Sequence, residues 1–454
     1  MLSSAACTFG PDYAPRSASE LAVPAGWQGA TVGEAADITA WWTGFGDPVL
    51  TSLVERALSG NPDLAQSFAR VAQARESLAQ TRGSTLPQLD ATERSGRNLN
   101  SDLPDTSSFA RSIDARWTVD LFGGQRRSVE AARASYEAAG FTLANAQALL
   151  AAEVANTYID LKTTRDRLTV AQSSMAVQRQ NEQIAGWRGQ AGLVSSIDVA
   201  QARAQRAQTA ASVPPLEQAE AQARYRLAVL TGEAPGALDA LLAGTAALPD
   251  VSDPIAAGAP SDLLRRRPDI LAAERDLAAA TARIGVAQAE LYPALTLTGS
   301  VGTSAASLGD LFDVITGSLF ATVAQVIFDG GQRKAAVRSQ QAAAEGAFAV
   351  YRSTILGALE DVESALVARS RAEARIIALT EQEAASRDAA LLARTNYRAG
   401  LTDLRVLLDA ERSLLAAEDG LASARGDRVS AVIQLYLALG GGWAADGADL
   451  QAKR

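Results

Sequence analysis

Few residues of this chain are able to do chemistry, and the residue types that are missing exclude several kinds of catalytic and metal site. The sequence has no histidine and a single cysteine, Cys7. Zinc sites, Ser-His-Asp triads and dithiol redox pairs depend on these residue types. A catalyst built only from carboxylates or lysines is the alternative that stays open. We therefore expect a protein that is not an enzyme and that has no metal site and no cofactor.

Two carboxylates lie beside predicted turns. Asp409 follows Arg405 by four residues, a helical spacing at which an acid and a base can pair. Asp198 follows Ser195 by three residues, which is also the pattern of a capping box. Asp409 lies too far inside its predicted helix to cap it. From spacing alone, Asp198 could cap a helix, and Asp409 could form a surface pair with Arg405.

A long internal repeat organises the chain around these residues. Motifs of the first half return 206 to 208 residues later. The paired motifs are Asn61-Pro-Asp with Arg267-Pro-Asp, Leu86-Pro with Tyr292-Pro, Gly123-Gly-Gln-Arg with Gly330-Gly-Gln-Arg, Ala191-Gly-Leu with Ala399-Gly-Leu, and Leu230-Thr-Gly with Ala438-Leu-Gly. A repeat of this length indicates a duplicated half-protein and not a solenoid of short units. We divide the chain into an N-terminal extended segment (1–46), a first repeat (47–250), a second repeat (251–443) and a C-terminal tail (444–454).

Proline, glycine and hydrophobic periodicity predict the same order of elements in both repeats. The expected helices are 47–60, 62–83, 124 to about 189, 195–230, 331 to about 399 and 403–439, and the expected strands are 86–98, 111–122, 295–301 and 318–328. The strands 111–122 and 295–301 alternate between apolar and polar residues, whereas the other two are assigned by symmetry. Loops at 100–108 and 303–316 would join each pair. Pro214 and Pro215 predict a break or kink in the helix 195–230.

The predicted strands require more than one copy of the chain. Four strands cannot close a barrel, because about eight is the smallest number that does. In lipid an open sheet edge would leave backbone groups unpaired, at several kcal/mol each. Three copies would supply twelve strands, and the long proline-free helices, each a rod of roughly 100 Å, would continue the barrel as a tube. The elements therefore predict an oligomeric channel.

These motifs together resemble the TolC-like outer-membrane efflux factors over about 47–443. The lipoprotein subgroup that serves resistance-nodulation-division pumps is the one most similar. Its typical motifs are Val213-Pro-Pro-Leu-Glu, Arg224-Tyr-Arg-Leu-Ala-Val-Leu-Thr-Gly, Arg267-Pro-Asp-Ile and Leu437-Ala-Leu-Gly-Gly-Gly-Trp. The resemblance implies a mainly α fold with a β-barrel part: a trimer with a 12-stranded outer-membrane β-barrel, four strands per chain, continued by a long periplasmic α-helical barrel.

The resemblance also implies a function. The protein would be the outer-membrane exit duct of a tripartite efflux pump, passively conducting drugs or other small molecules. Its partners would be a periplasmic adaptor, an inner-membrane resistance-nodulation-division pump and outer-membrane lipid. The duct of a type I protein secretion system is one alternative, and a soluble coiled-coil scaffold is another. A net charge of −9 argues against nucleic acid as a partner.

The family pattern assigns roles to individual residues. Cys7 resembles a lipobox cysteine that carries a lipid anchor, although Ser4 stands where an aliphatic residue is usual and only six residues precede Cys7. We expect a truncated or misassigned start, and an incidental cysteine is the alternative. Asp409, Asp198 and Tyr397 match the periplasmic gate, where three copies of an aspartate would favour cations and the tyrosine would help hold the closed state. Helix capping is the alternative for Asp198, and a packed helix residue is the alternative for Tyr397. Arg405 stands where relatives carry an aliphatic residue, so this gate could close by an ion pair of Arg405 with Asp409, and a surface contact is the alternative.

Glycines mark the ends of the long helices. Gly192-Leu193 and Gly400-Leu401 read as helix C-caps followed by exposed leucines, and they resemble the tips that contact the adaptor. Gly123-Gly124 and Gly330-Gly331 lack the lysine of a phosphate-binding loop. We expect these two pairs to turn each strand sharply into its helix.

Overall fold

The computed structural model describes residues 9–28, 37–99, 106–244, 247–249 and 257–444. Contacts divide the chain into two units, and each unit draws on both repeats. We call residues 1–21, 68–142 and 269–355 the strand unit, and residues 22–67, 143–268 and 356–454 the hairpin unit. In the described part of the chain, no helix has an apolar stretch long enough to cross a membrane.

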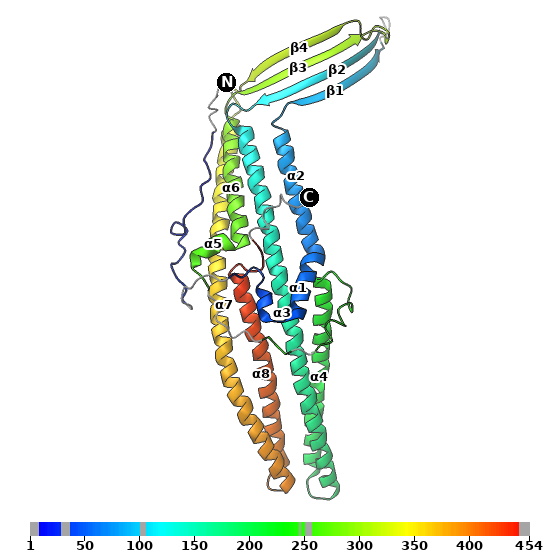
Figure 1. Ribbon diagram of the computed structural model, residues 1–454, viewed down its shortest axis with the longest axis vertical. Coiled ribbons are helices and arrows are strands. Elements are labelled where there is room, and N and C mark those ends of the chain that lie inside the picture. The colour runs from blue at the N-terminus through cyan, green and yellow to red at the C-terminus, as the bar shows by residue number, and fades with distance from the viewer. Residues whose placement is uncertain (1–8, 29–36, 100–105, 245–246, 250–256, 445–454) are drawn as a thin grey trace. The chain divides into compact units, whose positions relative to one another are not determined.

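The strand unit contains one antiparallel sheet in the order β1-β2-β3-β4 (Figure 1). Its strands are β1 (Gln88–Asn98), β2 (Thr106–Val119), β3 (Ala294–Ala305) and β4 (Ile315–Ala324). The two repeats meet between β2 and β3, which pair from Phe109 opposite Ala305 to Val119 opposite Leu295. Each repeat therefore contributes one hairpin, and the two hairpins form a single sheet.

The four predicted strands are present, with different ends. β2 begins at Thr106 and not at Arg111, because its ladder with β1 extends to Asn98 opposite Thr106. β3 continues to Ala305, so the loop after it is shorter than expected. β4 ends at Ala324 and not at 328. Its partner there is Ala294, and Pro293 before it has no N–H with which to continue the ladder.

The N-terminal segment of the strand unit lies against the helices next to the sheet. It contacts α6 (Pro268–Ala289) and the first parts of α3 (Gly124–Gln190) and α7 (Gln332–Ala399), whereas α2 (Pro62–Gly83) leads into β1. The buried guanidinium of Arg127 on α3 donates to Asp12 (2.6 Å), to Glu130 (2.7 Å) and to the carbonyl of Phe9 (3.2 Å). The ring of Phe9 stacks on Tyr292 at 4.3 Å. These contacts fix the segment that follows Cys7, which itself lies outside the described residues.

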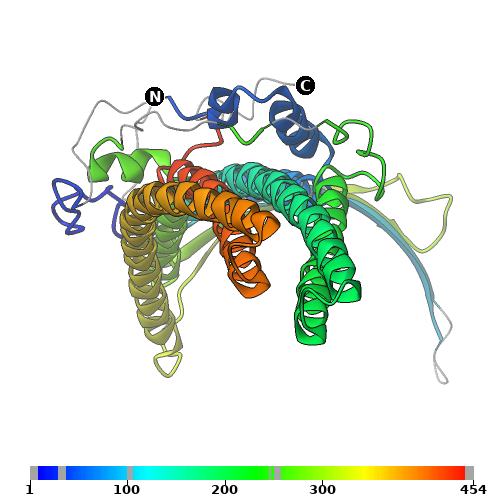
Figure 2. The ribbon, with the colours of Figure 1, turned by 90° about the horizontal axis from the view of Figure 1, so that it is seen from below.

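The hairpin unit consists of two long antiparallel helix pairs (Figure 2). The first pair is α3 with α4 (Ser196–Leu230), and the second is α7 with α8 (Leu404–Ala438). Shorter elements accompany them: the 3-10 helices η1 (Trp41–Phe45) and η2 (Pro260–Asp262), and the helices α1 (Pro48–Gly60) and α5 (Leu263–Arg266). The predicted long helices are confirmed to within about two residues at each end.

Of the predicted break or kink at Pro214 and Pro215, the break is wrong, and the kink stays a prediction. Helix α4 runs without interruption from Ser196 to Leu230, and both prolines lie inside it. The prolines leave the carbonyls of Ala210 and Ala211 without their usual i+4 donors, a cost of about 3 kcal/mol or more. Packing along the rest of this helix outweighs that cost, since Val213, Leu227 and Leu230 are all buried.

A buried ion pair ties the start of α1 to α3. The Nζ of Lys162 donates to the Asp47 carboxylate at 2.6 Å and to the carbonyl of Ala247 at 2.8 Å. The Tyr158 hydroxyl donates to the same carboxylate oxygen at 3.0 Å, while the other oxygen caps α1. Both charged side chains are over nine-tenths buried. Burial raises the pKa of Asp47, but hydrogen bonds from Lys162, from the Leu50 N–H and from Tyr158 outweigh burial. The pKa of Asp47 is therefore lowered.

The end of each repeat packs against its beginning, which explains two of the repeated motifs. Gly232 has a φ of 78°, and a Cβ there would lie 2.1 Å from the carbonyl oxygen of Gly60. Asn61 donates to the carbonyl of Leu230 at 2.9 Å. In the second repeat Gly440 has a φ of 84° and packs on Arg266 in the same way. Only glycine combines this backbone conformation with so close an approach.

Candidate functional site

The turns that join the two helix pairs have the same construction. At the first turn Gly192 has a φ of 70°, and the Leu193 N–H donates to the carbonyl of Arg188 at 2.8 Å. At the second turn Gly400 has a φ of 75°, and the Leu401 N–H donates to Asn396 at 2.8 Å. Both are glycine C-caps of the Schellman type. Leu193 and Leu401 are 74% and 77% exposed, so each turn presents one apolar side chain to its surroundings.

An apolar cluster joins the two helix pairs beside these turns. Tyr397 of α7 is its largest fully buried side chain. Around it lie Ala185, Ala202, Ala393, Leu404, Leu407 and Leu408. The Arg188 guanidinium lies over the Tyr397 ring at 4.5 Å. The Tyr397 hydroxyl has no hydrogen-bond partner in the described part of the chain. Tyr397 is thus a packed core residue, and its role in holding a closed state stays a prediction.

Asp409 pairs with a residue that the sequence analysis did not select. Its carboxylate accepts from Arg412 at 2.9 Å, three residues further along α8. Arg412 also donates twice to the amide oxygen of Gln205 on α4, at 3.2 and 2.9 Å. Gln205 is 5% exposed, whereas the Arg412 side chain is about half exposed, so this link between the helix pairs is partly buried. An arginine at i+3 from Asp409 was visible in the sequence, whereas the partner 207 residues away was not.

The expected pair of Arg405 with Asp409 within one chain is not formed. Arg405 is exposed, one helical turn before Asp409, and among the described residues it has no ion-pair partner. Arg412, on the C-terminal side of Asp409, donates to the Asp409 carboxylate instead. It also donates to the amide oxygen of Gln205. A contact of Arg405 with a neighbouring chain stays a prediction.

Asp198 forms the capping box that its spacing with Ser195 indicated. Its carboxylate accepts from the Ser195 N–H at 2.9 Å, and the Ser195 hydroxyl accepts from the Asp198 N–H at 3.1 Å. The carboxylate also accepts from that hydroxyl at 2.8 Å. The side chain therefore stabilises the start of α4. A gate function for Asp198 remains a separate prediction.

Two further ion pairs brace the helix pairs near their turns. Arg394 of α7 donates to the buried carboxylate of Glu411 on α8 at 3.0 and 2.6 Å. Arg206 of α4 lies 2.6 Å from Glu182 of α3. Sequence reasoning missed both pairs, because their members are 17 and 24 residues apart on opposite sides of a turn. Each pair holds the two helices of one hairpin in register.

The glycine pairs between strand and helix lie in the strand unit. Gly123, Gly330 and Gly331 have positive φ values of 82°, 63° and 89°. Gly124 begins α3, where a Cβ would lie 2.9 Å from that of Ala289. An aspartate precedes each pair and accepts N–H groups at the start of the helix: Asp120 from Arg126, and Asp329 from Gly331 and Arg333. These glycines let the chain turn sharply and let the helices approach closely.

Comparison with known proteins shows the family to which the chain belongs. Residues 53–233 and 259–441, one segment in each repeat, match the family described as outer membrane efflux protein. The chain belongs to this family. It is an outer-membrane efflux channel that extends into the periplasm, and the prediction that it is not an enzyme is confirmed. The comparisons give no support to a type I secretion duct or to a soluble scaffold.

Relatives and solved structures match this efflux protein over nearly its whole length. Nodulation protein T of Rhizobium leguminosarum bv. trifolii is 31% identical, covering 96% of this chain and 95% of that protein. The pyoverdine export outer membrane protein OpmQ of Pseudomonas putida is 34% identical, covering 94% and 93%. The outer-membrane channel OprN superposes with a TM-score of 0.89 at 35% identity, covering 96% and 100%. The predicted TolC-like fold is confirmed.

Proposed function

We propose that three copies of this efflux protein form the exit duct of a tripartite pump, which conducts small molecules passively from a periplasmic adaptor and an inner-membrane pump to the exterior. The observation that carries the proposal is the family match across both repeats, together with a sheet that is open at both sides. In the described sheet β1 and β4 each have a neighbour on one side only. All ten residues of β4 are exposed in the single chain.

The open sheet predicts the oligomeric state. Pairing of β4 in one copy with β1 of the next would satisfy both edges, and three copies would close a sheet of twelve strands. Native mass spectrometry of the detergent-extracted protein should show a trimer and no lipid-inserted monomer. A stable monomer taken from the outer membrane would contradict the proposed duct.

The two turns are the proposed contacts with the adaptor. Leu193 and Leu401 support this assignment, because each is an exposed leucine held in place by a glycine cap. Cys7, as a lipid anchor, would hold the chain to the outer membrane. The gate would lie beside the turns, where Asp409 and Asp198 from three copies could form an acidic constriction. Arg412 and Gln205 join the proposed gate residues, because they hold Asp409 and link the helix pairs.

Replacing both leucines with aspartate should weaken adaptor binding at least tenfold while leaving the trimer intact. The reason is that an apolar contact surface would then carry two desolvated charges. Binding of the purified adaptor to the trimer and drug tolerance of the host strain would measure the effect. The double change Leu193→Met and Leu401→Met keeps the apolar surface and is the control. Unaltered adaptor binding by the aspartate variant would show that the turns do not dock.

A further inference from the structure

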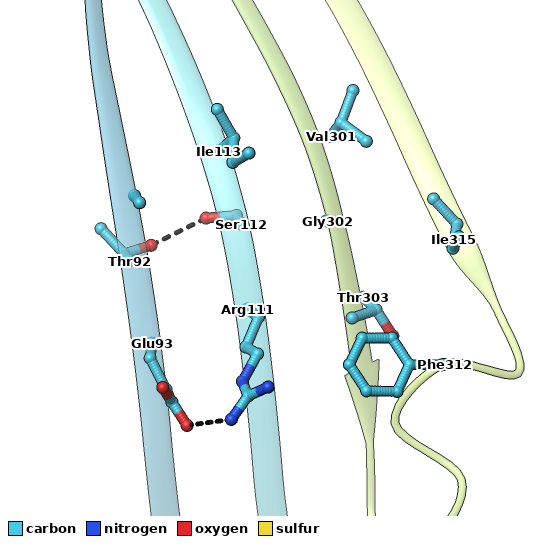
Figure 3. Close-up of a pocket in the computed structure, with 11 residues that line it drawn as sticks. Thr92, Glu93, Arg111, Ser112, Ile113, Val301, Gly302, Thr303, Phe312 and Ile315 are labelled. Carbon is cyan, nitrogen blue, oxygen red and sulfur yellow. Dashed lines mark hydrogen bonds and ion pairs between the residues drawn. The ribbon is translucent and has the colours of Figure 1, made fainter.

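Polar side chains beside a hollow of about 620 Å³ on the sheet have partners on neighbouring strands (Figure 3). The hydroxyls of Thr92 and Ser112 are hydrogen-bonded at 2.7 Å. The Arg111 guanidinium donates to the Glu93 carboxylate at 2.8 Å. Strand register places this ion pair on the apolar face of the sheet, which also carries Ile113. Buried polar groups of the hairpin unit differ, because several of them lack such partners.

Four buried polar side chains lie on the two helices of the first helix pair. Gln178 and Asn181 belong to α3, and Gln205 and Thr209 belong to α4. Each of the four is between 1% and 5% exposed. Polar residues on long helices are usually exposed, so their burial indicates contact with further helices. We call these four residues the polar layer.

Helical spacing places the polar layer beside the apolar cluster of Tyr397. The two members on α3 lie seven and four residues before Ala185, and the two on α4 lie three and seven residues after Ala202. Residues at these spacings share one face of a helix, and both alanines belong to the cluster that joins the helix pairs. The ion pair of Arg206 with Glu182 holds the two halves of the layer at the same level. The polar layer therefore lies in the contact with the second helix pair.

Most of the polar layer lacks hydrogen-bond partners. Gln205 accepts from Arg412 of α8. In the described part of the chain, the other three side chains leave four buried atoms without a partner. These atoms are both polar atoms of the Gln178 amide, the amide nitrogen of Asn181 and the hydroxyl oxygen of Thr209. A polar group that is buried without a partner loses its hydration and gains nothing in return, so these atoms destabilise the contact.

The polar layer interrupts a stripe of each helix that is otherwise apolar. On α3 the stripe includes Ala185 and Ala171, and on α4 it includes Ala202 and Val213. All four of these side chains are buried. Apolar side chains at the positions of the layer would continue the stripe without the penalty of unpaired polar groups. The layer therefore lowers the stability of this contact, as is typical of elements that must separate in function.

We propose that the polar layer favours separation of the two helix pairs. Its unpaired groups stay unsatisfied while the pairs are in contact, and they gain hydrogen bonds to water when the pairs separate. The apolar cluster and the bond from Arg412 to Gln205 oppose the separation. The inference rests on the duct and gate proposed above, and it identifies residues that act against the contacts that would close the gate.

Single-channel recordings of the reconstituted trimer test the proposal. The double change Gln178→Leu and Thr209→Val replaces unpaired groups with apolar side chains of similar size. It should lower the fraction of time that the channel is open about tenfold, the factor that corresponds to the penalty of about one unpaired group. An unchanged open fraction in an intact, conducting trimer would overturn the role of the polar layer but not the duct. Wild-type trimers without conductance would count against the duct.

A stability measurement and a matched control complete the test. The unfolding temperature of the double variant should rise, because the contact would bury fewer unpaired groups. A lower unfolding temperature would overturn the proposal, since it would show that these groups are bonded in the closed contact, for example to buried water. Gln180→Leu makes the same chemical change at an exposed position of α3 and should leave the open fraction unchanged. An equal decrease in Gln180→Leu would show that added apolar surface, and not the polar layer, explains the effect.

Discussion

Lys162→Met is expected to lower the free energy of unfolding by about 3–5 kcal/mol, the largest stability effect that this structure predicts. The change removes the cation that neutralises Asp47, and both side chains are over nine-tenths buried. Asp47 would keep its hydrogen bond from Tyr158 and the helix N–H groups of α1, but its charge would lie unpaired away from water. Denaturant unfolding of the detergent-solubilised protein, followed by circular dichroism, would measure the loss.

A matched control and a pH series make this prediction specific. Arg226→Met removes a cation paired with Glu153 where both side chains are about half exposed, and it should cost less than about 1 kcal/mol. Asp47 has a lowered folded pKa, so its contribution is present above the unfolded value of about 3.9 and is lost as pH falls through the folded value. The difference in free energy of unfolding between wild type and Lys162→Met should therefore narrow below about pH 4. A gap that does not depend on pH would mean that lost packing, and not charge, explains the effect.

Arg412→Ala should raise the resting conductance of the channel by about ten- to a hundredfold. The change removes two hydrogen bonds from a charged donor to the buried amide of Gln205, and if these bonds hold the proposed gate closed, their loss would shift its balance by about 1.5–3 kcal/mol. The pair with Asp409 adds less, because both side chains are more than half exposed. Planar-bilayer recordings of the reconstituted trimer would measure the conductance.

Three further variants test which contact would hold the proposed closed state. Gln205→Ala should reproduce most of the effect of Arg412→Ala, and the double variant should add little, because both changes remove the same bonds. Arg405→Ala is the control, since Arg405 has no ion-pair partner among the described residues. Increased leak in Arg405→Ala but not in Arg412→Ala would instead support a contact of Arg405 with a neighbouring chain. High salt should weaken the Asp409 contribution and leave that of Gln205 nearly unchanged.

The sequence alone determined the order of elements, the duplication and the family. Proline and glycine act locally through φ and through the missing donor, so Pro62, Gly192 and Gly400 mark helix ends wherever the chain folds. The capping box of Ser195 and Asp198 is equally local, and it formed as its spacing indicated. Alternation of apolar and polar residues located β2 and β3, because one face of each strand differs chemically from the other.

Tertiary structure decided what depends on partners distant in the sequence. The ends of β4 follow from its ladder with β3, and the helical state of Pro214 follows from packing along α4. Arg412 was preferred to Arg405 as the partner of Asp409, and α4 supplies Gln205 as a second acceptor from 207 residues away. Spacing along one helix cannot indicate such contacts, because they arise only when two helix pairs lie side by side. The same holds for the ion pair of Glu93 and Arg111, which strand register places on the apolar face of the sheet.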